Sequence, residues 1–154
     1  MQIKLEPVTA KNEAAVRALS LHTAQAHLIE PIDECLAEAA ADARWQPVGV
    51  SIDGHLVGFS MFGQFPSGKD PRGRVWFDRL LIDKRFQGKG YGRAAAAHVL
   101  AHMQAQYRPS GIYLSVYEDN TPAIALYQSL GFAYTGEKDT KGEDVMYLRV
   151  VKEV

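Results

Sequence analysis

The sequence is poor in cysteine and in long apolar runs, and each shortage excludes a class of protein. Cys35 is the only cysteine among 154 residues, which excludes an internal disulfide and any metal site built from several cysteines. No apolar stretch approaches the ~20 residues of a membrane-spanning helix, and the first residues lack the apolar segment of a signal peptide. The formal net charge of −1 gives no overall attraction to nucleic acid or to an anionic membrane. We therefore expect a cytoplasmic protein without a nucleic-acid or membrane partner.

The composition, with 47% hydrophobic and 23% charged residues, is that of a globular protein. The length predicts a single domain over residues 1–154. The patterns predict a strand at 2–8, a helix from Thr9 to near Pro31, a helix at 32–43, a hairpin at 47–63 around Asp53-Gly54, a loop at 67–73, a strand at 74–82, a helix from the glycines to about Gln106, a strand at 112–117, a helix within 118–132, and a hairpin at 133–151 around Lys141-Gly142. This order predicts an α/β (α+β) fold, with a mixed and largely antiparallel sheet of about 6–7 strands and helices on both faces.

Residues 87–92 read "QGKGYG" and join the strand at 74–82 to the long helix. A Walker phosphate loop would need Lys and then Ser or Thr, but Arg93 and Ala94 follow Gly92. The dinucleotide fingerprint would need an acid about 20 residues later, where no acid stands. The remaining pattern is Gln/Arg-x-x-Gly-x-Gly/Ala at a helix start, whose free N–H groups and dipole attract a phosphate. A plain strand-to-helix turn without a ligand is the alternative.

A second polar pair lies further along, in "NTPAIALYQSLGF". Asn120 stands at the expected helix start, and Tyr127 follows seven residues later. Seven residues are about two helical turns, so both side chains are expected on one helix face. Tyr127 alone would be interpreted as an amphipathic residue between core and solvent.

Together, "LLIDKRFQGKGYG" and "NTPAIALYQSLGF" resemble the GNAT superfamily of N-acetyltransferases, in its pyrophosphate loop and in its Asn-x₆-Tyr helix. With "PVGVSIDGHLVGFSMFGQFP" and "IYLSVYEDN", the chain also looks like the bacterial spermine/spermidine (diamine) acetyltransferases. The resemblance implies the GNAT fold, acetyl-CoA as cosubstrate and a homodimer. It implies transfer of the acetyl group to a primary amine of a polyamine or diamine (spermidine, spermine), with another small amine or a protein N-terminus as the alternative acceptor. We expect no metal, because His98 and His102, four residues apart, have neither an HExxH glutamate nor an evident third ligand. A catalytically silent acyl-CoA-binding module is the alternative outside the enzymes.

The resemblance also implies roles for individual residues. The pantetheine arm would pair with the backbone of Leu80, Leu81 and Ile82. The pyrophosphate would lie on the loop formed by Gln87, Gly88, Lys89, Gly90, Tyr91, Gly92 and Arg93. Asn120 would hydrogen-bond the cosubstrate, and Tyr127 would protonate the leaving thiolate as general acid.

The acceptor amine must lose a proton, and three acids are candidates for its uptake or for substrate binding. Asp78 is expected on one strand face with Trp76, Leu80 and Ile82. The resemblance places an acidic contact near Asp78, and it places Glu30 in a loop over the acceptor side. Glu118 is the third candidate. Each acid could instead be a surface carboxylate or an ion-pair partner, as Asp78 would be with Arg79 or Arg74.

Overall fold

The computed structural model describes residues 1–68 and 70–150. In chain order its elements are β1 (Ile3–Pro7), α1 (Glu13–Arg17), the 3₁₀ helix η1 (Thr23–Leu28), α2 (Ile32–Ala41), β2 (Gln46–Ile52), β3 (His55–Ser67), β4 (Asp70–Ile82), the 3₁₀ helix η2 (Lys84–Phe86), α3 (Tyr91–Tyr107), β5 (Gly111–Val116), α4 (Thr121–Ser129), β6 (Ala133–Lys138) and β7 (Asp144–Arg149). The strands and α-helices follow one another in the order that the sequence predicts.

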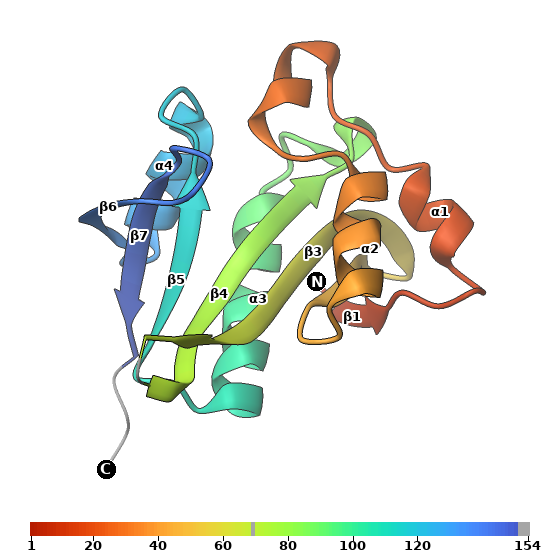
Figure 1. The fold of residues 1–154 in the computed structure, drawn as a ribbon. Coiled ribbons are helices and arrows are strands. Elements are labelled where there is room, and N and C mark those ends of the chain that lie inside the picture. Colours follow the sequence, from red (N-terminus) through yellow and green to blue (C-terminus); the bar gives the residue numbers. More distant parts are fainter. Residues whose placement is uncertain (69, 151–154) are drawn as a thin grey trace.

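The strands form one sheet in the order β1-β2-β3-β4-β5-β7-β6. Neighbouring strands are antiparallel except β4 and β5, which run parallel. Helices α1 and α2 cover one face of the sheet and α3 and α4 the other (Figure 1). The predicted fold class, a mixed and largely antiparallel sheet between two helical layers, is confirmed.

Each face of the sheet has its own apolar core. Phe62 and Phe77 are buried with Met103 of α3 on one face. Phe59 is buried on the other face, where it packs in one cluster with Cys35 of α2. Burying one such aromatic ring contributes roughly 1.5–3 kcal/mol, so these contacts fix which helix lies on which face.

Strand β4 contains a β-bulge, beyond which its side chains alternate between the two sheet faces in the reversed order. Met61 of β3 pairs with Arg79, but the next residue, Phe62, pairs with Phe77, so Asp78 is the extra residue. A bulge shifts the alternation of side chains by one position. Leu80 and Ile82 consequently pack with the core on the α3 side, together with Phe77. The expectation that Trp76, Asp78, Leu80 and Ile82 share one face is therefore wrong.

The helix expected from Thr9 to near Pro31 is interrupted. Helix α1 ends at Arg17, and the chain resumes only as η1. Between them, the Ser20 N–H donates to the Asp83 carboxylate at 2.9 Å, and the Ser20 carbonyl accepts from the Lys84 N–H at 2.8 Å. These contacts with the end of β4 replace helical hydrogen bonds, so tertiary pairing overrides the local helix signal.

The loop expected at 67–73 is instead strand on both sides of Lys69, which lies outside the described residues. Ser67 pairs with Asp70 and Phe65 with Arg74, so strand pairing between β3 and β4 continues almost to the tip of their hairpin.

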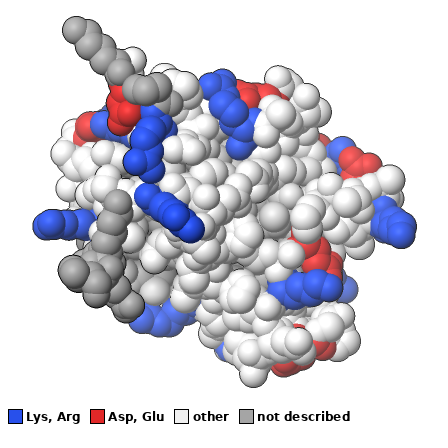
Figure 2. All heavy atoms as spheres, turned by 90° about the horizontal axis from the view of Figure 1, so that it is seen from below, with Lys and Arg blue, Asp and Glu red and all other residues white. Residues whose placement is uncertain are grey.

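The end of the molecule away from the glycine loop carries interspersed Lys, Arg, Asp and Glu side chains (Figure 2). Among the described residues, the structure contains no helix of sufficient length and apolarity to cross a membrane.

Candidate active site

The parallel strands β4 and β5 separate soon after they meet. Among the described residues, they pair only at Val75 with Ile112 and at Trp76 with Tyr113. The bulge at Asp78 follows directly and bends β4 away from β5. Over the rest of the described strands, the β5-facing edge of β4 has no strand beside it, and Figure 1 shows the two strands diverging. Cavities along this edge form a cleft between β4 and the start of α4.

The glycine loop forms one end of this cleft. Gly88 and Gly90 both have φ of +78°, a conformation that favours glycine, and an added Cβ would meet nothing within 4 Å. Helix α3 begins directly after Gly90 and has no side-chain cap. The N–H groups of its first turn point away from the helix body, and the dipole of a 17-residue helix adds positive potential. The loop therefore offers an open cradle for an anion.

The other residues predicted in this loop differ in what they contact. Gln87 donates to the Ile82 carbonyl at 2.9 Å and exchanges amide hydrogen bonds with Gln25 of η1 at 3.0 and 3.1 Å. Its side chain therefore anchors the loop between β4 and η1. Arg93 bonds to the Ser129 hydroxyl of α4, and the Lys89 ammonium lies 6.0 Å from the centre of the Phe86 ring.

The cleft next to the loop contains a cavity that is lined by residues of the loop, of β4 and of the start of α4. This cavity, of about 270 Å³, runs from the loop along β4 to the start of α4. Its lining includes the predicted cofactor residues Leu80, Leu81, Ile82, Gln87, Gly88, Gly90, Tyr91, Gly92 and Asn120. The structure thus brings together most of the residues that the sequence assigned to the cofactor.

Asn120 and Tyr127 lie on the same face of α4, as predicted. Asn120 is the N-cap, and its side-chain oxygen accepts the Ala123 N–H at 3.4 Å. Tyr127 packs edge-on against Phe77 and Phe132, with ring centroids 5.9 and 5.8 Å apart. Both Asn120 and Tyr127 line a smaller cavity that adjoins Leu80 and Asp78. Burial raises the pKa of the Tyr127 phenol above its ordinary range, so the hydroxyl keeps its proton at neutral pH.

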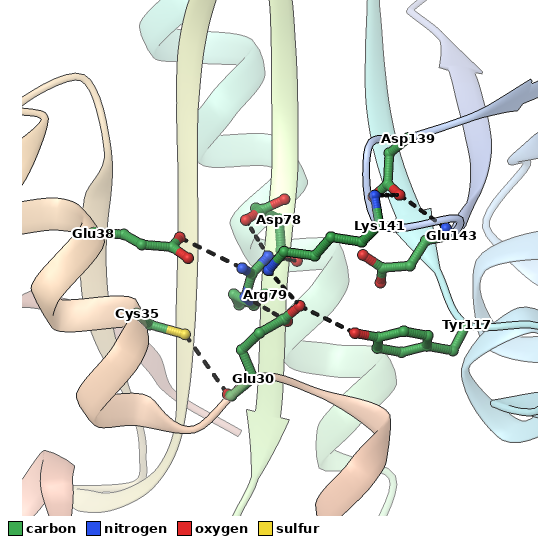
Figure 3. Close-up of polar contacts among 9 residues, drawn as sticks. All are labelled: Glu30, Cys35, Glu38, Asp78, Arg79, Tyr117, Asp139, Lys141 and Glu143. Atoms are coloured by element: carbon green, nitrogen blue, oxygen red, sulfur yellow. Dashed lines mark hydrogen bonds and ion pairs between the residues drawn. The ribbon is translucent and has the colours of Figure 1, made fainter.

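Beyond Tyr127 the cleft ends in a group of charged side chains centred on Arg79 (Figure 3). Arg79 is buried, and its Nε lies 3.0 Å from the Glu30 carboxylate. The same guanidinium contacts Asp78 and lies 3.5 Å from Glu38 of α2. Burial opposes ionisation of Glu30, but hydrogen bonding to Lys141 and the charge of Arg79 outweigh it and lower the pKa of Glu30.

Two other carboxyl groups at this end hold protons more tightly. Burial is the main cause that raises the pKa of Asp78 to about 6, against the opposing charge of Arg79. Burial, with a hydrogen bond to Asp139, raises the pKa of Glu143 to about 8. Both Asp78 and Glu143 line the cavity that contains Tyr127. Carboxyl groups that titrate near neutral pH can exchange a proton with a bound amine.

Sequence reasoning missed much of this group. Its unpredicted members are Glu38, Tyr117, Asp139, Lys141 and Glu143, with Arg79 considered only as a possible partner of Asp78. The Asp78–Arg79 pair is present, whereas Arg74 pairs with Glu137 at 2.7 Å. Glu118 is exposed and lines none of the cavities along this cleft. The density of charge in 137–144 was the one available signal.

Within residues 1–68 and 70–150, no group of three or more His, Cys, Asp or Glu side chains is placed to hold a metal ion.

Comparisons with known proteins show the family of this chain. Residues 9–132 match the model of the acetyltransferase (GNAT) family. A spermine/spermidine N(1)-acetyltransferase of Bacillus subtilis (strain 168) is 43% identical over 150 residues, which cover 95% of this chain and 97% of that protein. An N-alpha-acetyltransferase of Mycobacterium tuberculosis is 33% identical over 89 residues, or 58% of this chain and 52% of that protein.

Solved structures share the fold. A spermidine N-acetyltransferase from Vibrio cholerae, in complex with CoA and spermine, matches with a TM-score of 0.73 at 20% identity, over 96% of this chain and 95% of that one. An aminoglycoside acetyltransferase in complex with coenzyme A matches with a TM-score of 0.77 at 17% identity, over 96% and 95% of the two chains. The chain belongs to the acetyltransferase (GNAT) family and is an N-acetyltransferase.

Proposed function

We propose that this enzyme transfers the acetyl group of acetyl-CoA to a primary amine of a polyamine or diamine, such as spermidine or spermine. The observation that carries the proposal is the excess of carboxyl groups over cations at the end of the cleft beside Tyr127. The carboxyl groups are those of Glu30, Glu38, Asp78, Asp139 and Glu143, and the cations are Arg79 and Lys141. A polycation is attracted to such a site. The name of the 43% identical Bacillus relative describes this reaction.

The cleft fits acetyl-CoA. The open cradle at Gly88 and Gly90 and the uncapped start of α3 suit a pyrophosphate. The unpaired edge of β4 at 80–82 suits an extended pantetheine arm, which would bind there as an added strand does. Asn120 uses its oxygen for the cap and keeps its amide N–H₂ for a ligand carbonyl.

Tyr127 is proposed as the general acid. The amine nitrogen attacks the thioester carbonyl carbon, the carbon–sulfur bond breaks, and the Tyr127 hydroxyl supplies the proton that the leaving sulfur takes up. The smaller cavity is lined by Tyr127 together with Leu80, so the hydroxyl lies at the edge of β4 that is assigned to the pantetheine arm.

The acidic end of the cleft is proposed to take up the proton of the amine. Alkylamines have pKa values near ~10.4, so the acceptor arrives as an ammonium and must lose a proton before it can attack. Glu30, Asp78 and Glu143 all border the Tyr127 cavity, but they differ in charge near neutral pH. Asp78, with a pKa of about 6, is mostly ionised and suits proton uptake, whereas Glu143, with a pKa of about 8, mostly holds a proton already. Glu30 is held ionised by Arg79 and Lys141 and suits binding of a positive charge.

An amine panel with free CoA release as the readout tests the proposal. We expect the highest kcat/KM for spermidine and spermine, lower values for short diamines, and little turnover of monoamines, aminoglycosides, amino acids or N-terminal peptides. A preference for an N-terminal peptide, or no response to polyamines, would refute the polyamine acceptor. CoA binding without turnover of any amine would indicate a silent acyl-CoA-binding module.

A cytoplasmic location, which the sequence pattern predicts, and a homodimer, which the family resemblance implies, also belong to this proposal. Light scattering on the purified chain tests the dimer directly, since a homodimer has twice the mass of the 17.0 kDa chain.

A further inference from the structure

A lysine of the chain itself reaches into the acidic end of the cleft. Lys141 stands in the turn between β6 and β7, and its side chain extends across the group of acids toward Asp78 and Arg79 (Figure 3). Its Nζ lies 3.0 Å from the Glu30 carboxylate, 111 residues away in the sequence. The Lys141 side chain is 44% exposed, whereas the Glu30 side chain that it contacts is only 9% exposed.

Glu30 has other partners besides Lys141. The Arg79 Nε lies 3.0 Å from one carboxylate oxygen, and the Tyr117 hydroxyl donates to the other at 3.2 Å. Arg79 already supplies a full positive charge to Glu30. Burial and the charge of Arg79 oppose the Lys141 ammonium, but the hydrogen bond to Glu30 and its charge outweigh them and raise the pKa of Lys141. Removal of the lysine would therefore leave the Glu30 carboxylate paired with Arg79. It would not create an isolated buried charge, which would be strongly destabilising.

Lys141 also presents the same chemical group as the end of a polyamine. It is a primary ammonium on an unbranched alkyl stem, and it lies on a carboxylate next to the cavity of Tyr127. The contact shows that the acidic group accommodates an alkylammonium at this position.

We propose that Lys141 occupies the subsite for the distal ammonium of the acceptor, and that a polyamine must displace it from Glu30 to bind. This inference rests on the proposed polyamine acceptor. An acceptor with a second ammonium compensates for the broken Lys141–Glu30 pair by its own contact with Glu30. An acceptor with one amine has no group to place there. Lys141 thus weakens polyamine binding and sets how strongly the enzyme favours acceptors with several charges.

The test compares Lys141→Met with wild type on spermidine and on propylamine, which has no distal charge. We expect KM for spermidine to fall about three- to fivefold, which is the upper part of the range that loss of one partly exposed competing ion pair implies. The kcat for spermidine and the low kcat/KM for propylamine should stay within about twofold. Lys141→Arg keeps a cation on Glu30 and should resemble wild type. Lys138→Met is the matched control, because Lys138 pairs with Asp144 at 2.8 Å on the same hairpin.

An unchanged or higher KM for spermidine in Lys141→Met would overturn the inference. A loss of kcat on both amines would overturn it too, since that result would assign Lys141 to the positioning of Glu30. If wild type acetylates no polyamine, the proposed function is refuted, and the inference about Lys141 is refuted with it. If wild type acetylates spermidine while Lys141→Met leaves its KM unchanged, only the present inference fails. Thermal melts confirm that the variants are folded.

Discussion

Replacing Tyr127 with phenylalanine removes one oxygen from the cleft and leaves the packing of the ring in place. The edge-on contacts with Phe77 and Phe132, at 5.9 and 5.8 Å between centroids, depend on the ring and not on the hydroxyl. We therefore expect a change in the free energy of unfolding within about 1 kcal/mol, or about 2–4 °C in Tm for a domain of this size.

The effect on turnover should be much larger. A positioned general acid contributes about 10²- to 10⁴-fold to rate, so Tyr127→Phe should lower kcat by about that factor, equivalent to about 2.7–5.4 kcal/mol in the activation barrier. The affinity for acetyl-CoA should stay nearly unchanged, because the residues assigned to the pyrophosphate and pantetheine are untouched. Burial keeps the pKa of Tyr127 high, so the hydroxyl should not be lost as a proton donor near neutral pH.

The assay is steady-state CoA release with spermidine, together with calorimetric titration of CoA and a thermal melt. Tyr134→Phe is the control, because Tyr134 is 48% exposed on β6 and lies outside the cleft. A Tyr127→Phe enzyme with kcat within about threefold of wild type would remove Tyr127 from the mechanism. A large fall in acetyl-CoA affinity would instead assign the hydroxyl to cosubstrate binding.

Two other predictions concern the loop and the acidic end of the cleft. Gly90→Ala and Gly54→Ala both place a side chain at positive φ (+78° and +85°) with no atom within 4 Å of the new Cβ, so each should lose about 1 kcal/mol of stability. Only Gly90→Ala should raise KM for acetyl-CoA, and an equal rise in Gly54→Ala would refute the cradle. The pKa of Glu143 is raised to about 8, so the folded state retains a proton that the unfolded chain releases, and the free energy of unfolding falls as pH rises from the ordinary carboxyl range toward 8. Glu143→Gln should therefore be more stable than wild type by on the order of 1 kcal/mol at pH 9, with a smaller difference at pH 5. A pH-independent difference in Tm would contradict the shifted pKa.

Local signals were enough to predict most elements and the cofactor side of the site. Asp53-Gly54 turns with φ of +50° and +85°, which is the backbone that an Asp-Gly hairpin requires. Asn120 caps α4, and the spacing of seven residues places Tyr127 on the same face. These features depend on neighbours in the sequence, so the sequence carries them. The prediction of one helix from Thr9 to near Pro31 was wrong, because Ser20 pairs with residues at the end of β4, more than 60 positions away.

The sequence by itself determined the order of the elements, the glycine loop at the start of α3, and the pairing of Asn120 with Tyr127. Only the tertiary structure decided the acceptor side. The bulge at Asp78 depends on the register of β4 against β3, and it sets both the facing of β4 and the opening of the cleft. The contact of Glu30 with Arg79 and Lys141 joins three distant segments. Ion pairs of this kind depend on which distant segments the sheet and its turns bring together, so no local sequence pattern predicts them.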